Sequence, residues 1–222
     1  MAGDLYIVAT PIGNLADITF RAIEVLGFVD IIACENRDRH IKLLNHYQIK
    51  KRLIEYSPAN ERNSSKGIVK LLLEGKNVAL VSDAGVPTLS DPGRVLIQDA
   101  VKEGVRVIPI PGASAITAIA SVSTEHPKRL VFLGFLSKSN SKQEKELLLF
   151  KEMDCSIIVF VSQYHIKFFL NTINKIFGNV DIIIGREMTK INEEFIRGKV
   201  VDLVNCEFEE RGEFTVEIEN YL

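Results

Sequence analysis

The chain has 222 residues, of which 46% are hydrophobic and 25% are charged, as is typical of a folded globular protein with a sizeable core. Its net charge of −2 excludes the strongly basic balance of a dedicated nucleic-acid binder, so any nucleic-acid contact must rest on local basic patches. The cysteines, Cys34, Cys155 and Cys206, form no CxxC pair, which argues against a disulfide framework and favours a reducing, cytoplasmic compartment.

The N-terminal segment predicts a strand at Leu5–Ala9, followed by a loop over residues 10–17. The chain begins without the basic region of a signal peptide, and no apolar run approaches the ~18 residues of a membrane span, so we expect no membrane segment. Apolar residues at helical spacing, including Phe20 and Leu26, predict a helix over Ile18–Val29 that buries this face.

The next elements predict a strand over residues 30–35, a helix to about Tyr47, a strand over 53–56 and a helix that ends near Gly75. They lead to the stretch Val78–Gly93, which reads VALVSDAGVPTLSDPG. Its first four residues predict a buried strand, and a small-residue loop follows. We expect Asp91 to cap a helix over Gly93–Val101, with Pro92 in the first turn, where no backbone N–H is required.

A strand, a loop and a helix follow one another repeatedly, with loops at residues 10–17, 82–93 and 111–115. This alternation predicts an α/β fold with a parallel sheet and helices on both faces. The carboxyl ends of parallel strands share one edge of the sheet, and ligands bind there in folds of this kind. We therefore expect the three loops to form one ligand site.

The amino-acid composition changes at residues 124–129, which are mostly polar and contain a proline. This predicts an N-terminal α/β domain over residues 1–124 and a C-terminal α/β domain over 125–222. In the second domain, residues 137–146 predict a mobile loop that leads into a helix. Strands are expected near residues 130–132, 156–161, 181–187 and 214–219, and helices over 142–150 and 164–176.

The three loops limit the class of ligand. They match neither the GxxxxGK[ST] motif of a triphosphate site nor the GxGxxG motif of a dinucleotide site, and they are poor in basic residues. A nucleoside held by backbone amides and apolar contact fits them better than a polyphosphate. The histidines show no metal-ligand spacing, so we expect no metal and interpret them as solvated or locally bonded; they are His40, His46, His126 and His165.

Five strings of the sequence, ATPIGNLADIT, SDAGVPTLSDPG, PGASA, GFLSKSNSK and REMTKINEEFIRG, resemble the tetrapyrrole methylase superfamily. Within it they resemble the bacterial branch that 2′-O-methylates a cytidine ribose in small-subunit ribosomal RNA. The resemblance implies two α/β domains with S-adenosylmethionine in the cleft between them, and a homodimer. By motif position it implies cofactor contacts at Pro11, Asp83, Ala84, Gly85, Ser114, Ala115, Met188, Phe214 and Thr215.

Methyl transfer from a sulfonium places limits on what the carboxylates can do. The sulfonium loses its positive charge in the transition state, so a carboxylate at the sulfur would stabilise the ground state more and slow the reaction. We therefore expect Asp83 to serve the nucleoside or the loop backbone. A ribose hydroxyl is a weak acid, so a base would help, and Glu35 and Glu187 at strand ends are candidates; their alternative role is a salt bridge to a nearby arginine. Expected contacts to RNA phosphates are Arg37, Arg39, Lys138 and Arg186.

Two segments depart from the family pattern. The chain has Glu35–Asp38 where the family has Glu-Asp-Thr-Arg, and Ser162–Ile166 where the family has Glu-Ser-Pro-His-Arg. The chain also ends at Leu222, without the basic helical extension of longer members. These departures leave two alternatives open. One is a methyltransferase of the same fold that acts on a tetrapyrrole or another small molecule. The other is a protein that binds RNA or cofactor without turnover.

Overall fold

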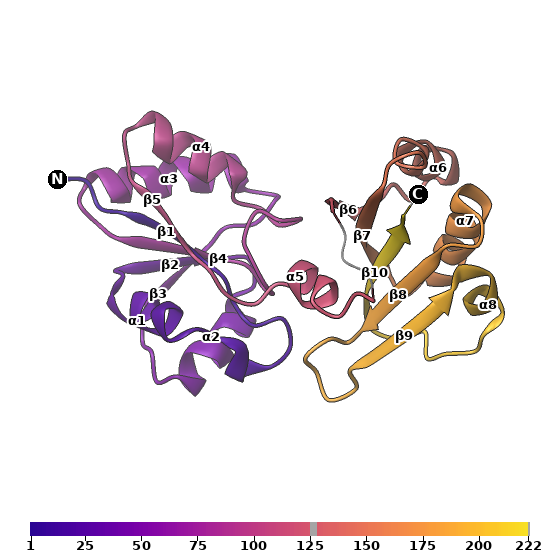
Figure 1. Ribbon diagram of the computed structural model, residues 1–222. Helices are drawn as coiled ribbons and strands as arrows, with labels where there is room; N and C mark the ends of the chain where they lie inside the picture. Colours follow the sequence, from indigo (N-terminus) through magenta and orange to yellow (C-terminus); the bar gives the residue numbers. More distant parts are fainter. Residues whose placement is uncertain (125–127, 222) are drawn as a thin grey trace. The chain divides into compact units, whose positions relative to one another are not determined.

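The structure is a computed structural model that describes residues 1–124 and 128–221 (Figure 1). It combines helices and strands in the α/β class that the alternation of elements predicts, and so confirms that class. Contacts divide the chain into two compact units, Met1–Ser114 and Ala115–Leu222. The sequence predicts a domain boundary between residues 124 and 125. Residues 125–127 lie outside the described residues, so that boundary stays a prediction.

The first unit contains a five-stranded sheet in the order β3-β2-β4-β1-β5. All of its strand pairs are parallel. The carboxyl ends of β2, β4, β1 and β5 therefore lie along one edge, as the sequence predicts. The strands are β1 (Leu5–Val8), β2 (Ile31–Cys34), β3 (Arg52–Glu55), β4 (Val78–Val81) and β5 (Val107–Ile110).

Helices cover both faces of this sheet (Figure 1). Ala79 and Val81 of β4 pack in the core with α1 and α2, whereas Val78 and Leu80 pack in the core with α3 and α4. A strand buried on both faces needs a continuous apolar run, which is why the sequence reveals β4 so clearly. The helices are α1 (Phe20–Phe28), α2 (Arg37–His46), α3 (Glu61–Leu73) and α4 (Arg94–Lys102).

The first helix begins later than the apolar spacing predicts. Leu15–Asp17 form the short 3-10 helix η1, and α1 starts at Phe20 with the Thr19 hydroxyl accepting the Ala22 N–H at 3.1 Å. The prediction that Phe20 is buried is wrong, since its side chain is 88% exposed. Phe20 precedes the buried Ala22 by two positions, which places it about 200° away around the helix axis.

The prediction that Asp91 caps α4 is also wrong. The N-cap residue is Gly93, at φ 137°, and its N–H donates to Glu61 Oε1 at 2.9 Å. The Leu96 N–H donates to the Tyr56 hydroxyl at 3.2 Å, and that hydroxyl donates to Glu61 Oε1 at 3.0 Å. The groups that satisfy the first turn of α4 thus come from Tyr56, which follows β3, and from Glu61 of α3, so Asp91 is not needed as a cap.

The second unit contains a mixed five-stranded sheet in the order β6-β7-β10-β8-β9, in which only the β6–β7 pair is parallel. Strand β9 escapes the sequence prediction because it pairs with β8 alone and carries charged residues and a glycine among its apolar ones. The strands are β6 (Leu130–Phe135), β7 (Cys155–Ser162), β8 (Asp181–Arg186), β9 (Glu194–Lys199) and β10 (Glu213–Asn220).

Helices α6 (Asn140–Leu148), α7 (Ile166–Phe177) and α8 (Val200–Asn205) pack on the face of this sheet that presents Val216 and Ile218. Helix α5 (Ala115–Ala120) contacts β10, and the segment after it is held by the opposite face, where the Ser123 hydroxyl donates to Glu217 Oε2 at 2.7 Å. Across the described residues, no helix has the length and apolar character needed to cross a membrane.

Candidate functional site

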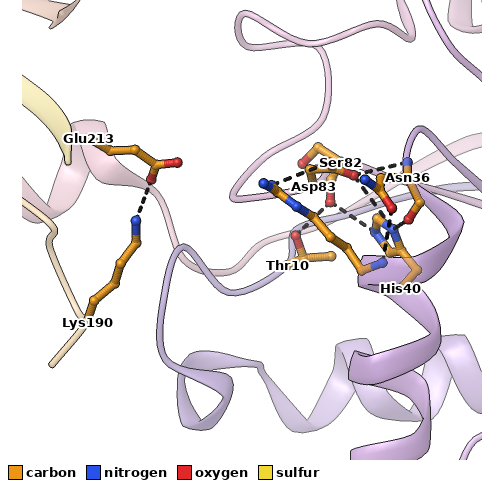
Figure 2. Close-up of polar contacts among 8 residues, drawn as sticks. Thr10, Asn36, His40, Ser82, Asp83, Lys190 and Glu213 are labelled. Atoms are coloured by element: carbon orange, nitrogen blue, oxygen red, sulfur yellow. Dashed lines mark hydrogen bonds and ion pairs between the residues drawn. The ribbon is translucent and has the colours of Figure 1, made fainter. Parts of the chain in front are cut away.

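The loops after β1 and β4 are joined directly. The Thr10 N–H donates to the Gly85 carbonyl at 2.9 Å, and the Gly85 N–H donates to the Thr10 carbonyl at 3.0 Å. The Thr10 hydroxyl also donates to the Ser82 carbonyl at 2.9 Å, as Figure 2 shows. The Ser82 hydroxyl donates to the Gly85 carbonyl at 2.9 Å. Residues 82–85 are therefore held in one conformation by bonds within the loop and from β1.

The loop after β5 approaches the other two so closely that only small residues fit. Gly85 lies at φ +80°, and a Cβ there would sit 3.3 Å from Ile12 Cγ2 and 3.6 Å from the Ala113 carbonyl oxygen. A Cβ at Gly112 would sit 3.0 Å from the Cβ of Ala9. The structure thus brings together the three loops that the sequence singles out.

The first turn of α2 supports the loop after β4 from the other side. Asp83 Oδ1 accepts the Asn36 N–H at 3.2 Å, and Asp83 Oδ2 lies 3.4 Å from the Arg39 guanidinium. Asn36 Oδ1 accepts the Arg39 N–H at 3.1 Å and so caps α2. Asn and Asp are both good N-caps, so Asn36 keeps this function where the family has Asp, with one negative charge fewer beside Asp83.

Asp91 is a functional candidate that sequence reasoning missed, because the Ser-Asp-Pro-Gly pattern fits a helix cap equally well. Its carboxyl is half-buried at the same edge of the sheet. Burial, together with the negative charges of Glu35 and Asp83, raises the pKa of Asp91 to about 6. A carboxyl with such a pKa can accept or release a proton near neutral pH.

Glu187 has a different setting in the second unit. Its Oε1 accepts from Lys190 Nζ at 2.8 Å and from the Glu213 N–H at 2.8 Å. Burial raises the pKa of Glu187, but these two bonds and the charges of Lys190 and Arg186 outweigh burial and leave the pKa below its ordinary value. Lys190 also contacts Glu213 Oε2 at 2.9 Å (Figure 2). Glu187 therefore holds the turn after β8 to β10.

The other predicted site residues fall into two sets, one in each unit. In the first unit, Pro11 and Ala84 lie in the joined loops, and Ser114 ends the loop after β5. Arg37 and Arg39 are exposed on the first turn of α2. Asp83 and Gly85 lie in the same joined loops, so most of the predicted first-unit residues come together at one edge.

In the second unit, Phe214 pairs with Arg186 across β10 and β8, beside Thr215. Phe214 points into the core, whereas Thr215 is buried on the opposite face. Met188 is buried too, and a Cβ on Gly185 would sit 2.7 Å from its sulfur. The remaining two predicted residues lie apart from this set, Ala115 as the first residue of α5 and Lys138 exposed before α6.

No group of three or more His, Cys, Asp or Glu side chains within residues 1–124 and 128–221 is arranged to hold a metal ion. His126 lies outside these residues. His40 is buried and bonded to its surroundings, as the sequence interpretation allows, while His46 and His165 are exposed.

Comparison with known proteins shows likeness over nearly the whole chain. The profile of the family "Tetrapyrrole (Corrin/Porphyrin) Methylases" matches residues 4–204. A protein named "Ribosomal RNA small subunit methyltransferase I" from Bacillus subtilis is 41% identical over 219 residues, which cover 98% of this chain and 75% of that protein. A protein of the same name from Thermotoga maritima is 42% identical over 217 residues, which cover 96% of this chain and 97% of that protein.

Solved structures share the fold at much lower identity. Diphthine synthase matches with a TM-score of 0.74 and 15% identity, over 96% of this chain and 89% of that chain. Uroporphyrin-III C-methyltransferase from Thermus thermophilus, complexed with S-adenyl homocysteine, matches with a TM-score of 0.69 and 12% identity, over 97% of both chains. These likenesses confirm the fold of the tetrapyrrole methylases.

Proposed function

Because this chain belongs to the tetrapyrrole methylase family, we propose that it is an S-adenosylmethionine-dependent methyltransferase that 2′-O-methylates a cytidine ribose in 16S ribosomal RNA of the small subunit. The observation that carries the proposal is the likeness of more than 40% identity, over nearly the full length, to proteins named small-subunit ribosomal RNA methyltransferases. We also infer a homodimer that acts in the cytoplasm, where ribosomes are the substrate.

The joined loops of the first unit fit S-adenosylmethionine as the cofactor. Gly85 is buried where the loops after β1 and β5 approach it most closely, and the neighbouring loop residues Ala84 and Ala113 are small, so the loop backbones can lie close to a ligand. No lysine or arginine lies within residues 10–13, 82–85 or 111–114, as suits a nucleoside rather than a polyphosphate. We assign the adenosine part to these loops, while the cofactor contacts predicted at Met188, Phe214 and Thr215 stay predictions.

When bound, S-adenosylmethionine supplies an electrophilic methyl group. The chain must hold the 2′-hydroxyl in line with that group, and it must accept the proton that the hydroxyl loses. Glu35 and Asp91 lie at the carboxyl edge of the sheet and make no ion pair or hydrogen bond with another described residue, so both are available for this role. Glu187 is engaged by Lys190, and its lowered pKa makes it a weaker base.

The phosphates of the RNA are assigned to Arg37, Arg39, Lys138 and Arg186. Arg39 and Lys138 are exposed, whereas Arg186 donates to Glu194 Oε2 at 3.0 Å and would have to share its guanidinium. With a net charge of −2, the chain gains little from non-specific attraction to RNA. Recognition would therefore depend on the folded small subunit rather than on free RNA.

The proposal is tested by incubating the protein with labelled S-adenosylmethionine and small ribosomal subunits from cells that lack this modification. We expect label in 16S RNA, recovered as 2′-O-methylcytidine after nuclease digestion and identified by mass spectrometry. Label in a tetrapyrrole precursor but not in RNA would replace the proposal with small-molecule methylation. Cofactor binding without transfer to either substrate would indicate a non-catalytic member of the family.

A further inference from the structure

His40 lies between the two loops on which the proposed function depends. It is on α2, and its side chain is nearly fully buried, with 3% of the residue exposed. Nδ1 lies 2.9 Å from the carbonyl oxygen of Asn36, and Nε2 lies 3.1 Å from the carbonyl oxygen of Ser82 (Figure 2). One ring thus contacts the residue after Glu35 and the residue before Asp83.

Both neighbours of the ring are carbonyl oxygens, which only accept hydrogen bonds, so each ring nitrogen can pair with its neighbour only by donating. A neutral imidazole donates through one nitrogen, whereas the protonated ring donates through both. The carboxylate of Asp83, whose Oδ1 lies 3.8 Å from Nδ1, is placed to balance the charge of a protonated ring. With the proton on Nε2, or with both nitrogens protonated, the ring donates to the buried carbonyl of Ser82.

We propose that His40 is a positioning residue for the cofactor: by donating to the Ser82 carbonyl, it holds residues 82–85 against the first turn of α2, so that the loop backbone meets S-adenosylmethionine. The inference rests on the proposed function, because it assigns the loop to that cofactor. His40 is not placed to touch the reacting atoms. Its loss should therefore raise the KM for S-adenosylmethionine while kcat at saturating cofactor stays within about threefold.

Two substitutions separate the two bonds of the ring. His40→Gln can place an amide N–H where Nε2 lies and so keeps the donor to Ser82. His40→Asn can donate to the carbonyl four residues earlier and so keeps the bond to Asn36. The chain already contains this arrangement, since Asn171 Nδ2 donates to the Lys167 carbonyl at 2.9 Å in α7. Both variants preserve a polar side chain of similar size in a buried position.

The affinity for S-adenosylmethionine is measured by isothermal titration calorimetry with the full chain. We expect His40→Gln to bind within about threefold of the wild type, and His40→Asn to bind about tenfold more weakly or worse, since it leaves the buried Ser82 carbonyl with fewer donors. His46→Asn is the matched control, because His46 is exposed on the same helix. It should bind as the wild type does.

A second measurement covers the case in which His40→Asn folds poorly. Thr10→Val removes the other side-chain donor to the Ser82 carbonyl and leaves His40 in place. In a double-mutant cycle, the Thr10→Val and His40→Gln pair should lose affinity additively, whereas Thr10→Val combined with His40→Asn should lose more than the sum. Circular dichroism and the melting temperature identify any variant that has lost its fold.

The outcomes distinguish the inference from the function beneath it. If the wild type binds S-adenosylmethionine and His40→Asn binds it equally well, the positioning role of His40 is overturned and the proposed function stands. If Gln and Asn weaken binding to the same extent in folded variants, the Ser82 bond is not what matters, and the inference again fails. If the wild type itself does not bind, the proposed function fails, and the inference fails with it.

Discussion

Thr10 and Gly85 exchange both of their backbone hydrogen bonds, at 2.9 and 3.0 Å, and so form an antiparallel bridge beyond the ends of two parallel strands. The bridge is possible because Gly85 adopts φ +80°, a conformation that residues with a Cβ rarely tolerate. The exchange fixes the separation of the loops after β1 and β4. Any ligand that meets the backbone of both loops therefore meets a preformed surface.

Gly85→Val should abolish binding of S-adenosylmethionine. A Cβ at this position would contact Ile12 Cγ2 at 3.3 Å, and a branched side chain at positive φ would strain the bridge to Thr10. Calorimetric titration with the cofactor checks this. Gly67→Ala is the matched control, because Gly67 lies inside α3 with nothing within 4 Å of its Cβ position, and it should bind normally. Wild-type affinity in the Gly85 variant would remove this loop from the site.

Asp91→Asn should stabilise the protein at pH 7.5 by about 1 kcal/mol. The gain is small because the carboxyl is only half-buried and solvent screens part of its charge. The pKa of Asp91 is raised from 3.8 to about 6 in the folded protein. The stability that Asp91 contributes is therefore fully present below pH 3.8 and is lost as the pH rises through about 6. Urea unfolding at pH 4 and pH 7.5 measures the difference. A gap between variant and wild type that does not shrink at pH 4 would contradict the assignment.

Glu61→Ala should destabilise the protein by about 1–3 kcal/mol. The substitution leaves the Gly93 N–H and the buried Tyr56 hydroxyl without their shared acceptor at the start of α4. Glu103→Ala, at the exposed C-terminal end of the same helix, is the control and should change stability little. Chemical unfolding compares them. Equal stability of the two variants would show that the Glu61 carboxylate does not cap the helix.

Glu35→Gln and Glu187→Gln should affect different properties. If Glu35 accepts the hydroxyl proton, its amide variant should lower kcat about 100-fold while cofactor affinity is kept. Glu187→Gln weakens the ion pair with Lys190, so it should lower the free energy of unfolding by less than about 1 kcal/mol and leave kcat within about threefold. Transfer of labelled methyl groups to small ribosomal subunits gives kcat. The reverse pattern would assign the base to the second unit.

Several features of the fold could be predicted because they depend only on residues that are close together in the sequence. The apolar run of β4 indicates a strand buried on both faces, and the glycines after three strands indicate loops at one edge. The apolar spacing before Val29 identifies α1 but places Phe20 on the wrong face, because Phe20 lies about 200° around the helix from the buried Ala22. Strand β9 is lost for a related reason, since an edge strand needs no continuous apolar run.

The site residues divide in the same way. Asp83 and Gly85 stand out locally as a carboxylate and a glycine in a small-residue loop. The roles of Asp91 and His40 do not, because they depend on partners far along the chain. Glu61, which replaces Asp91 as the group that binds the start of α4, is 32 residues from Gly93, and His40 is 42 residues from Ser82.

The sequence by itself determined the α/β class, the carboxyl-edge loops and the kind of ligand that they suit, because helical and strand periodicity and turn chemistry act over a few neighbouring residues. Only the tertiary structure decided which donor meets which acceptor. The strand order β3-β2-β4-β1-β5 brings α2 beside the loop after β4, and no local pattern encodes that order. Hydrogen bonds need atoms within about 3 Å, so the pairing of His40 with Ser82 and of Thr10 with Gly85 follows from the packed fold.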